Sequence, residues 1–293
     1  MEPLTEKKLK EMEIMATRLR EDVIKMVSHA GSGHIAGALD MADVFTYLYF
    51  HALKHEPKNP DWPYRDIVVL SNGHICPVLY ATMAHAGYFP VKELMTLRKL
   101  GSRLQGHPHR DWLPQLETSS GPLGCGLSQA VGMAIADRMD NGVSSSKKIV
   151  CLMSDGELDE GNSWEAIALA GKEKLQNLTV ILDRNNIQID GFTETILPLE
   201  PLPEKWVDFN WHVQEVSGHD FRALDTAWNQ AQAMSGRPSV IIAHTIPSKG
   251  IPEFERKWQW HGKVPTTPLE IDEARRALGE IRTLGGKVRS EHQ

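Results

Sequence analysis

Acidic and amide side chains follow two strongly apolar runs of this sequence. Asp155 comes just after the run 148–153, within an acid-rich stretch, and Asn185 comes just after the run 178–182. Mg²⁺ prefers oxygen ligands and is commonly held by one or two protein groups together with substrate phosphates, so this pair suits a metal and diphosphate site. The alternative is that Asp155 only caps the next helix and that Asn185 and Asn186 only form a turn.

Four histidines stand in glycine-rich contexts, at His34, His74, His107 and His261. The pKa of histidine lies near neutrality, so four such side chains converging on one cleft could neutralise phosphates and transfer protons. Any one of them alone is more typical of a structural or surface histidine. His107 and His109 could suggest a zinc pair, but no complementary Cys or Glu-x-x-His motif supports one.

The stretch 118–126 is rich in glycine and precedes a helix expected to begin near Ser128. Such a turn lets the backbone approach a ligand closely and directs the first amides of the helix toward it. Gly124 and Gly126 also echo a dinucleotide-binding fingerprint, but no strong strand run precedes them and the third glycine is out of register. A plain turn into a helix is therefore the alternative.

Four β-branched runs and the segments between them predict an α/β fold, an open and mainly parallel sheet with helices on both faces. The runs are apolar throughout rather than alternating, which is typical of strands covered on both faces. The expected strands are 66–70, 148–153, 178–182 and 239–243, and the expected helices are 1–30, 128–139, 162–175 and 221–234. Ligands of such sheets bind beyond the carboxyl ends of the strands, where the polar residues described above lie.

The composition excludes several classes of function. The formal net charge is −6, and the scattered Lys and Arg residues give no footprint for nucleic acid or an anionic membrane. Three cysteines without CxxC spacing favour a reducing cytoplasm over a disulfide framework, and we see neither a signal peptide nor a membrane-spanning run. We expect one diphosphate-binding domain over 1–293, with a helical arm at about 1–30 and a C-terminal helix and tail at about 267–293. The long excursion 247–268 is typical of a functional loop.

These residues together resemble the transketolases, the thiamine-diphosphate enzymes that move two-carbon ketol units between sugars. The stretch from Ser154-Asp-Gly to Asn185 looks like the thiamine-diphosphate motif, and the similarity runs from about residue 15 to residue 270. Further motifs that are similar to those of the family occur in order, at Ser32-Gly-His34, Ser71-Asn-Gly-His74, Gly106-His-Pro108, Gly121-Pro-Leu-Gly124, Asp159-Glu-Gly161 and Trp260-His-Gly262.

The resemblance implies roles for individual residues. It implies that Mg²⁺, with Ca²⁺ or Mn²⁺ as substitutes, is bound by Asp155, the Asn185 side chain and the Ile187 carbonyl. The residues implied to contact thiamine diphosphate are His74, Gly121, Pro122, Leu123, Gly156, Glu157, Asn185, Lys249 and His261. Those implied in catalysis are His34, His107 and His261, which would face the sugar, and Glu160, which would couple to a glutamate of another chain. For Glu157, Asp159 and Glu165 the alternative is a solvated first-turn carboxylate favoured by the helix dipole.

Two features depart from the family pattern. Ser154 replaces the first glycine of the metal motif, which we expect to retune the site rather than remove it. Transketolases are also longer than this chain, and their second and third domains have no counterpart in it. The resemblance therefore implies a separately encoded partner subunit that carries the pyrimidine-binding and C-terminal domains, in a heterotetramer.

The implied function is that of the N-terminal subunit of a split transketolase. Such an enzyme breaks the carbon–carbon bond beside a ketose phosphate carbonyl and passes the two-carbon unit to an aldose, with thiamine diphosphate as the electron sink. The nearest alternatives are a related thiamine enzyme, of the dihydroxyacetone or deoxyxylulose-phosphate synthase type, and a non-catalytic regulator that binds thiamine diphosphate. The partners expected are sugar phosphates and the C-terminal transketolase subunit, with no nucleic acid and no membrane.

Overall fold

Residues 4–143 and 145–290 are described by a computed structural model of the chain. Its centre is a five-stranded sheet in which all neighbouring strands are parallel. The strands, in their order across the sheet, are β1 (Ile67–Leu70), β2 (Ile149–Ser154), β3 (Leu178–Arg184), β7 (Ser239–His244) and β6 (His212–Ser217). A short antiparallel pair, β4 (Ile187–Gln188) and β5 (Gly191–Phe192), follows β3. The predicted α/β fold with a parallel sheet is confirmed.

Successive residues of each strand point to opposite faces of the sheet, and each face has its own hydrophobic core. On β2, Val150 and Leu152 belong to one core, whereas Ile149, Cys151 and Met153 belong to the other. This strand is apolar throughout because both of its faces are covered.

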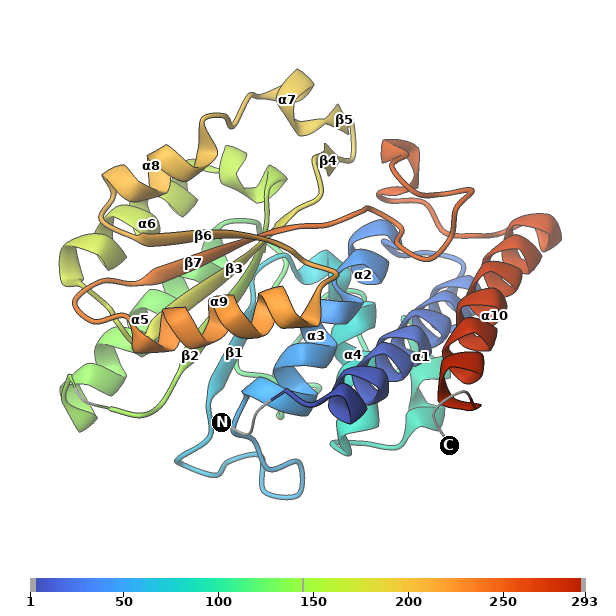
Figure 1. Cartoon of the computed structure of the whole chain (residues 1–293), viewed down its shortest axis with the longest axis horizontal. Coiled ribbons are helices and arrows are strands. Elements are labelled where there is room, and N and C mark those ends of the chain that lie inside the picture. The colour runs from blue at the N-terminus through green and yellow to red at the C-terminus, as the bar shows by residue number, and fades with distance from the viewer. Residues whose placement is uncertain (1–3, 144, 291–293) are drawn as a thin grey trace.

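Helices cover both faces of the sheet (Figure 1). The helices that share the first core are α1 (Glu6–Ala30), α2 (Ala36–Asp40), α3 (Ala42–Tyr47), α4 (Cys76–Ala86), α9 (Phe221–Ala233) and α10 (Pro268–Ser290). Those that share the second core are α5 (Cys125–Asn141), α6 (Gly161–Glu173) and α8 (Leu202–Asp208). The short helical segments are η1 (Leu48–Ala52), η2 (Gly73–Ile75), η3 (Val91–Thr96), η4 (Gly156–Asp159), α7 (Thr193–Ile196) and η5 (Trp258–Trp260).

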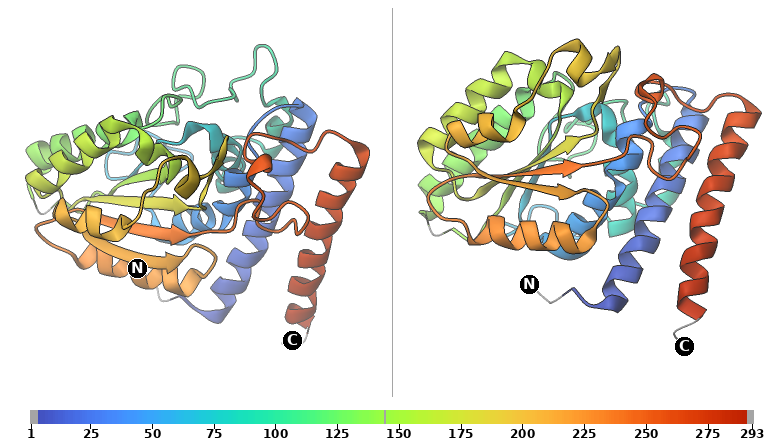
Figure 2. Two further views of the ribbon diagram at one scale, coloured as in Figure 1. Left: turned by 90° about the horizontal axis from the view of Figure 1, so that it is seen from above. Right: turned by 45° about the horizontal axis from the view of Figure 1, so that its top comes forward.

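Helix α1 forms where the amphipathic pattern predicts it. The Oγ1 atom of Thr5 accepts a hydrogen bond from the Lys8 amide at the start of the helix, and Gly31 ends it with a φ of 69°. Helix α10 lies alongside α1 in both views of Figure 2. The predicted arm at about 1–30 and the C-terminal helix and tail at about 267–293 extend to residues 1–3 and 291–293, which lie outside the described residues.

Strand β6 and the start of α5 differ from the prediction. Strand β6 lies at the edge of the sheet and is only partly buried, so it lacks the continuous apolarity that identifies the other strands. Helix α5 begins at Cys125 rather than near Ser128, because its first turn packs against the turn after β1, where Gly126 meets Ser71. The loop 247–268 contains only one short helical segment, η5.

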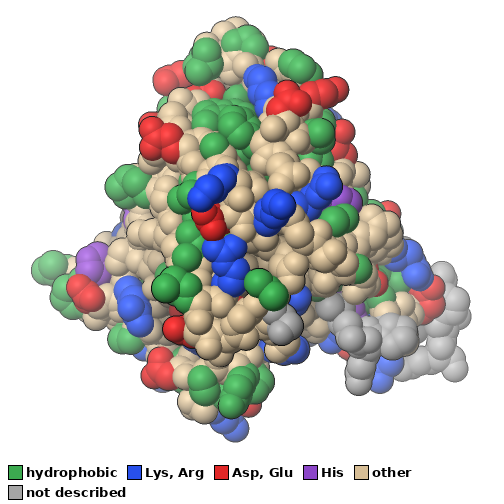
Figure 3. Space-filling model, turned by 90° about the vertical axis from the view of Figure 1, so that its left-hand side faces the viewer, with side chains coloured by type: hydrophobic (Ala, Val, Ile, Leu, Met, Phe, Trp, Pro, Cys, Tyr) green, Lys and Arg blue, Asp and Glu red, His purple; other side chains and the backbone are tan. Residues whose placement is uncertain are grey.

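Side chains of both charges are intermixed over the face drawn in Figure 3. Within the described ranges, no helix has both the length and the apolar character needed to cross a membrane. All three cysteines are free thiols, and two of them, Cys76 and Cys151, are buried.

Candidate functional site

A cavity of about 260 Å³ lies beyond the carboxyl ends of β1, β2 and β3. Its walls come from the turn after β1, the glycine-rich stretch before α5, the turn after β2, and β4, together with the segments that carry His34, His107 and His261. The lining residues are His34, His74, His107, Gly121, Leu123, Ser154, Gly156, Glu157, Ile187, Gln188, Ile189 and His261. All four histidines singled out in the sequence are among them, so we call this space the histidine cavity.

Three of the histidine rings face one another. The ring centroids of His34 and His74 are 5.0 Å apart, those of His74 and His261 are 5.3 Å apart, and those of His34 and His261 are 5.7 Å apart. The Nδ1 atoms of His34 and His261 are buried and have no hydrogen-bond partner among the described residues. Because a buried polar atom without a partner costs free energy, these nitrogens favour a ligand that can bond to them.

The histidine cavity keeps its imidazoles neutral. Burial lowers the pKa of His34 to about 4, and the neighbouring His261, Arg98 and His107 add to this shift. Burial also lowers the pKa of His261 to about 4 and holds that of His74 well below its usual value. A bound anion would oppose these shifts, since a negative charge nearby stabilises the imidazolium form.

Pyrophosphate is therefore expected to raise the pKa values of His34, His74 and His261, because it supplies the missing negative charge. The measurement is an NMR titration of the histidine ring signals with and without pyrophosphate and Mg²⁺. His212 is the matched control, because burial and Arg237 lower its pKa at the amino end of β6, away from the cavity. Unchanged titration midpoints while pyrophosphate is bound would contradict this expectation.

Asp155 lies at the end of β2 and its side chain is fully buried. Its Oδ1 atom accepts a bond from the Gly156 amide at 2.7 Å, and Oδ2 accepts one from the Asn186 amide at 2.7 Å and one from Arg184 at 3.1 Å. Burial raises the pKa of Asp155 to about 6, and the charge of Arg184 offsets part of this rise. Asp155 thus caps the turn, as the structural alternative holds. It does so as a buried carboxylate that accepts a hydrogen bond from Gly156, a residue that lines the cavity.

Asn185 is held by two buried acids. Its Nδ2 atom donates to Asp40 at 3.1 Å and to Asp183 at 3.0 Å, while its Oδ1 atom accepts the Ile187 amide at 3.1 Å. Burial raises the pKa of Asp183, and burial and the facing Asp183 raise that of Asp40. These contacts fix which atom of the Asn185 amide is the oxygen acceptor.

The donor set fits a hard cation. A carboxylate has about four acceptor positions and three of those on Asp155 are used, while the Asn185 oxygen accepts one bond of two. Each of the two residues accepts a hydrogen bond from a residue that lines the cavity, Asp155 from Gly156 and Asn185 from Ile187. Among the described residues no group of three or more His, Cys, Asp or Glu side chains could hold a metal, so a cation here would need amide, carbonyl and ligand oxygens as well.

Glu157 is a buried carboxylate that accepts hydrogen bonds from three segments around the cavity. Its Oε1 atom accepts bonds from the Ser71 hydroxyl at 2.5 Å and the Gly124 amide at 2.6 Å, and Oε2 accepts the Ser154 amide at 3.3 Å. Burial raises the pKa of Glu157 to about 7, and the three donors offset part of that rise. The solvated alternative is wrong for Glu157, which is buried, whereas Glu165 is exposed.

Replacing Glu157 by alanine is expected to lower the free energy of unfolding by about 3 kcal/mol, because the buried Gly124 amide and Ser71 hydroxyl lose their acceptor. Urea unfolding measures this change. Glu165→Ala, at an exposed position on α6, is the control and should change stability by less than about 0.5 kcal/mol. Equal stability of the two variants would show that Glu157 does not hold the loops.

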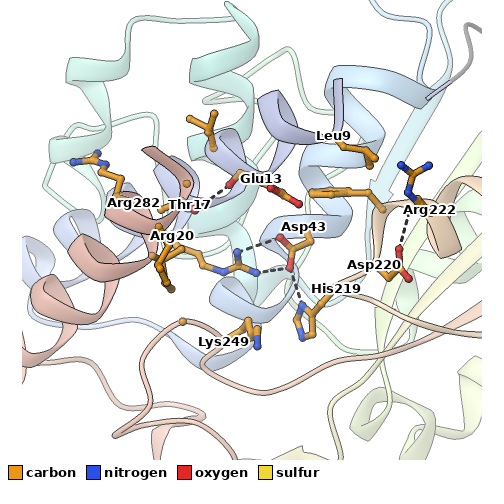
Figure 4. A pocket seen from close by; sticks show the side chains of 16 residues that line it. Leu9, Glu13, Thr17, Arg20, Asp43, His219, Asp220, Arg222, Lys249 and Arg282 are labelled. Carbon is orange, nitrogen blue, oxygen red and sulfur yellow. Dashed lines mark hydrogen bonds and ion pairs between the residues drawn. The ribbon is translucent and has the colours of Figure 1, made fainter. Parts of the chain in front are cut away.

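Five residues of the implied site are not among those that line the cavity: the buried Asp155 and Asn185 described above, and Pro122, Glu160 and Lys249. Pro122 is exposed between two lining residues, and Glu160 is exposed just before α6. Lys249 lines a different cavity of about 590 Å³, beside Arg20 and Asp43 (Figure 4). The structure therefore does not bring Lys249 to the histidine cavity.

The cavity that contains Lys249 has an internal charge network. The guanidinium of Arg20 bonds both carboxylate oxygens of Asp43, at 3.1 and 2.5 Å, and His219 bonds the same carboxylate at 2.7 Å. This network joins α1, α3 and the turn before α9, so it has a structural role in the packing of these helices.

Some residues of the site are not apparent from the sequence. Gln188 and Ile189 line the cavity, and only their place directly after Ile187 could have indicated this. Asp40 and Asp43 both stand in the mainly apolar stretch 35–48, and an acid in such a stretch is a signal for a buried polar contact. Arg184 has no comparable signal in the sequence, because a positively charged side chain beside a metal motif is not expected to lie close to the metal.

Comparisons with known proteins bear on this site. Residues 11–284 match the family described as transketolase, thiamine diphosphate binding domain. The chain is 41% identical over 251 residues to the 6-deoxy-6-sulfo-D-fructose transketolase subunit of Clostridium sp. (strain MSTE9), with 86% of this chain and 90% of that protein covered. It is 38% identical over 273 residues to an apulose-4-phosphate transketolase subunit of Actinobacillus succinogenes, with 93% and 96% covered.

Full-length transketolases are matched over only part of their length. The human transketolase is 36% identical over 279 residues, which are 94% of this chain and 43% of that protein. The crystal structure of transketolase from Campylobacter jejuni has a TM-score of 0.84 and 36% identity, and the match covers 92% of this chain and 42% of that one. This chain thus spans less than half of the full-length relatives and nearly all of the subunit relatives.

Proposed function

Because this chain belongs to the transketolase family, through its thiamine diphosphate binding domain, we propose that it is the diphosphate-binding subunit of a two-subunit transketolase. The observation that carries the proposal is the meeting of His34, His74 and His261, with two unpartnered nitrogens, in a cavity whose lining residues Gly156 and Ile187 donate to the buried Asp155 and Asn185. The enzyme would transfer a two-carbon ketol group from a ketose to an aldose.

In this proposal each group of residues has one task. The histidines and the Gly156 amide hold the diphosphate, and Gly121 and Leu123 line the space for the rings. Asp155, the Asn185 side chain and the Ile187 carbonyl hold Mg²⁺. When bound, thiamine diphosphate supplies the electron sink for carbon–carbon bond cleavage.

Proton transfer at the sugar would be the task of His34, His107 and His261. Burial and the neighbouring Arg98 lower the pKa of His107, as burial does for the other two, so each imidazole is neutral near pH 7. A neutral imidazole can accept a proton from a hydroxyl group and return it later. This supports a role as general base for residues that line the same cavity.

A second chain is proposed to complete the site. The relatives that match along nearly their whole length are named as subunits, which supports a partner for this chain as well. We propose that the partner carries the remaining transketolase domains, that the assembly is a heterotetramer, and that the exposed Glu160 lies at the interface. The three free thiols support a cytoplasmic location.

The substrates are proposed to be a ketose phosphate and an aldose phosphate. One relative is named for a sulfonated ketose and another for a phosphorylated one, so the ketol-transfer assay should include donor sugars with each of these anionic groups.

Calorimetric titration of the chain with thiamine diphosphate and Mg²⁺ tests the cofactor site, with and without the co-expressed partner. A ketol-transfer assay then compares the chain, the partner and the mixture. We expect transfer only in the mixture. Full activity of the single chain would overturn the two-subunit proposal, and a mixture that binds the cofactor without any transfer would favour the non-catalytic regulator.

A further inference from the structure

Arg184 connects the carboxylate of Asp155 to the molecular surface. It is the last residue of β3, and its side chain is 3% exposed. One guanidinium nitrogen donates to Asp155 at 3.1 Å and to the Thr193 hydroxyl at 3.0 Å, and the other donates to Glu194 at 2.6 Å and to Glu200 at 2.8 Å. The planar guanidinium can hold these four acceptors at once, which a lysine ammonium with three donors could not.

The two ends of this network differ in exposure. The Asp155 side chain is fully buried, whereas the side chains of Glu194 and Glu200 are 38% and 53% exposed. Arg184 therefore shares its charge between one inner and two outer carboxylates. Since Glu194 and Glu200 are accessible to solvent, their charge can change without any rearrangement of the core.

A cation at Asp155 would stand close to this positive charge. Two like charges in a buried site repel each other strongly unless neighbouring charges balance them. Glu194 and Glu200 supply that balance, because both bond the second guanidinium nitrogen and so offset part of the positive charge that faces Asp155. Without them Arg184 would be the counterion of Asp155 alone and would compete with a metal for it.

We propose that Arg184 is a positioning residue that sets the cation affinity of Asp155, and that Glu194 and Glu200 control this affinity through it. The inference rests on the proposed function of Asp155 as a metal ligand. It also links the metal site to the segment 191–200, whose Thr193 and Glu194 are held by the same guanidinium.

The test is a double-mutant cycle on the full chain co-purified with its partner. Glu194→Gln and Glu200→Gln are made together in the wild type and in an Arg184→Met background, and Mn²⁺ binding with thiamine diphosphate is followed by electron paramagnetic resonance. We expect the glutamate substitutions to weaken Mn²⁺ binding about tenfold in the wild type and less than about twofold in the Arg184→Met background.

Three controls separate this result from others. Glu204→Gln, at an exposed position on α8, should leave the affinity unchanged. A direct field effect of the exposed glutamates would be lost at high salt, whereas an effect through buried Arg184 should persist. If Arg184→Met does not fold, Arg184→Lys replaces it, because lysine keeps the charge but cannot bridge all the carboxylates.

The outcomes distinguish the inference from the proposed function. If the wild-type complex binds neither Mn²⁺ nor thiamine diphosphate, the proposed function fails. If it binds both, but the glutamate substitutions have no effect or have equal effects in both backgrounds, Arg184 does not transmit their charge and the inference is overturned.

Discussion

Replacement of Asp155 by alanine is expected to weaken Mg²⁺-dependent binding of thiamine diphosphate by about 100-fold or more, roughly 2.7 kcal/mol. The variant removes the only carboxylate of the proposed metal set, and the Asn185 amide and the Ile187 carbonyl carry no charge to replace it. The chain should still fold. Arg184 keeps Glu194 and Glu200 as partners, so the loss of stability should stay below the roughly 3–5 kcal/mol seen when an isolated buried ion pair is broken.

The metal dependence makes this prediction specific. Asp155→Asn keeps the size of the side chain and removes its charge, so calorimetry with and without Mg²⁺ should show a loss only in the presence of the metal. Glu165→Gln, exposed on α6, serves as a neutral control. Unchanged cofactor affinity of both Asp155 variants would remove Asp155 from the metal site.

Replacement of Gly126 by alanine is expected to destabilise the chain by about 3 kcal/mol and to abolish cofactor binding, because extra volume at a close contact forces atoms apart. A Cβ atom at this position would lie 2.5 Å from the Cα atom of Ser71, which is backbone and cannot rotate away. The Gly126 amide also donates to the Ser71 hydroxyl at 3.1 Å, and that hydroxyl bonds Glu157. Separation of α5 from the turn after β1 would thus open the wall of the histidine cavity.

Gly132 offers a matched control on the same helix. It is exposed in the interior of α5, and a Cβ atom there would meet nothing within 4 Å. Gly132→Ala should therefore raise the free energy of unfolding by up to about 1 kcal/mol through helix propensity alone. Urea unfolding and cofactor titration of both variants test the contrast, and a Gly126→Ala variant as stable as Gly132→Ala would contradict the close contact.

The sheet could be predicted because its central strands satisfy a simple rule. Strands β2, β3 and β7 are covered on both faces, so burial requires apolar side chains at nearly every position. Strand β6 at the edge escapes this requirement, and its mixed sequence carries no comparable signal. The histidines were predictable from local sequence, since each stands directly beside a glycine.

The support of the site could not be predicted from residue types. Glu157 looks like a solvated acid, but the turn after β2 directs it inward toward Ser71 and Gly124. Asp40 comes from a segment far from the metal motif in the chain, and although Arg184 directly precedes Asn185, its contact with Asp155 on the neighbouring strand depends on tertiary packing. Lys249 is the converse case, because the resemblance places it at the cofactor, whereas its side chain lines the cavity beside Arg20 and Asp43.

The neutral state of the three clustered histidines has a consequence for selectivity among anions in the cell. A neutral imidazole exerts no long-range attraction, so the empty cavity does not concentrate abundant monoanions such as chloride or bicarbonate. In the proposed function, a diphosphate that arrives with its own divalent cation would recover the cost of burying its charge while the rings stay neutral. The cavity would then discriminate by charge density before any contact with the organic part of the ligand is made.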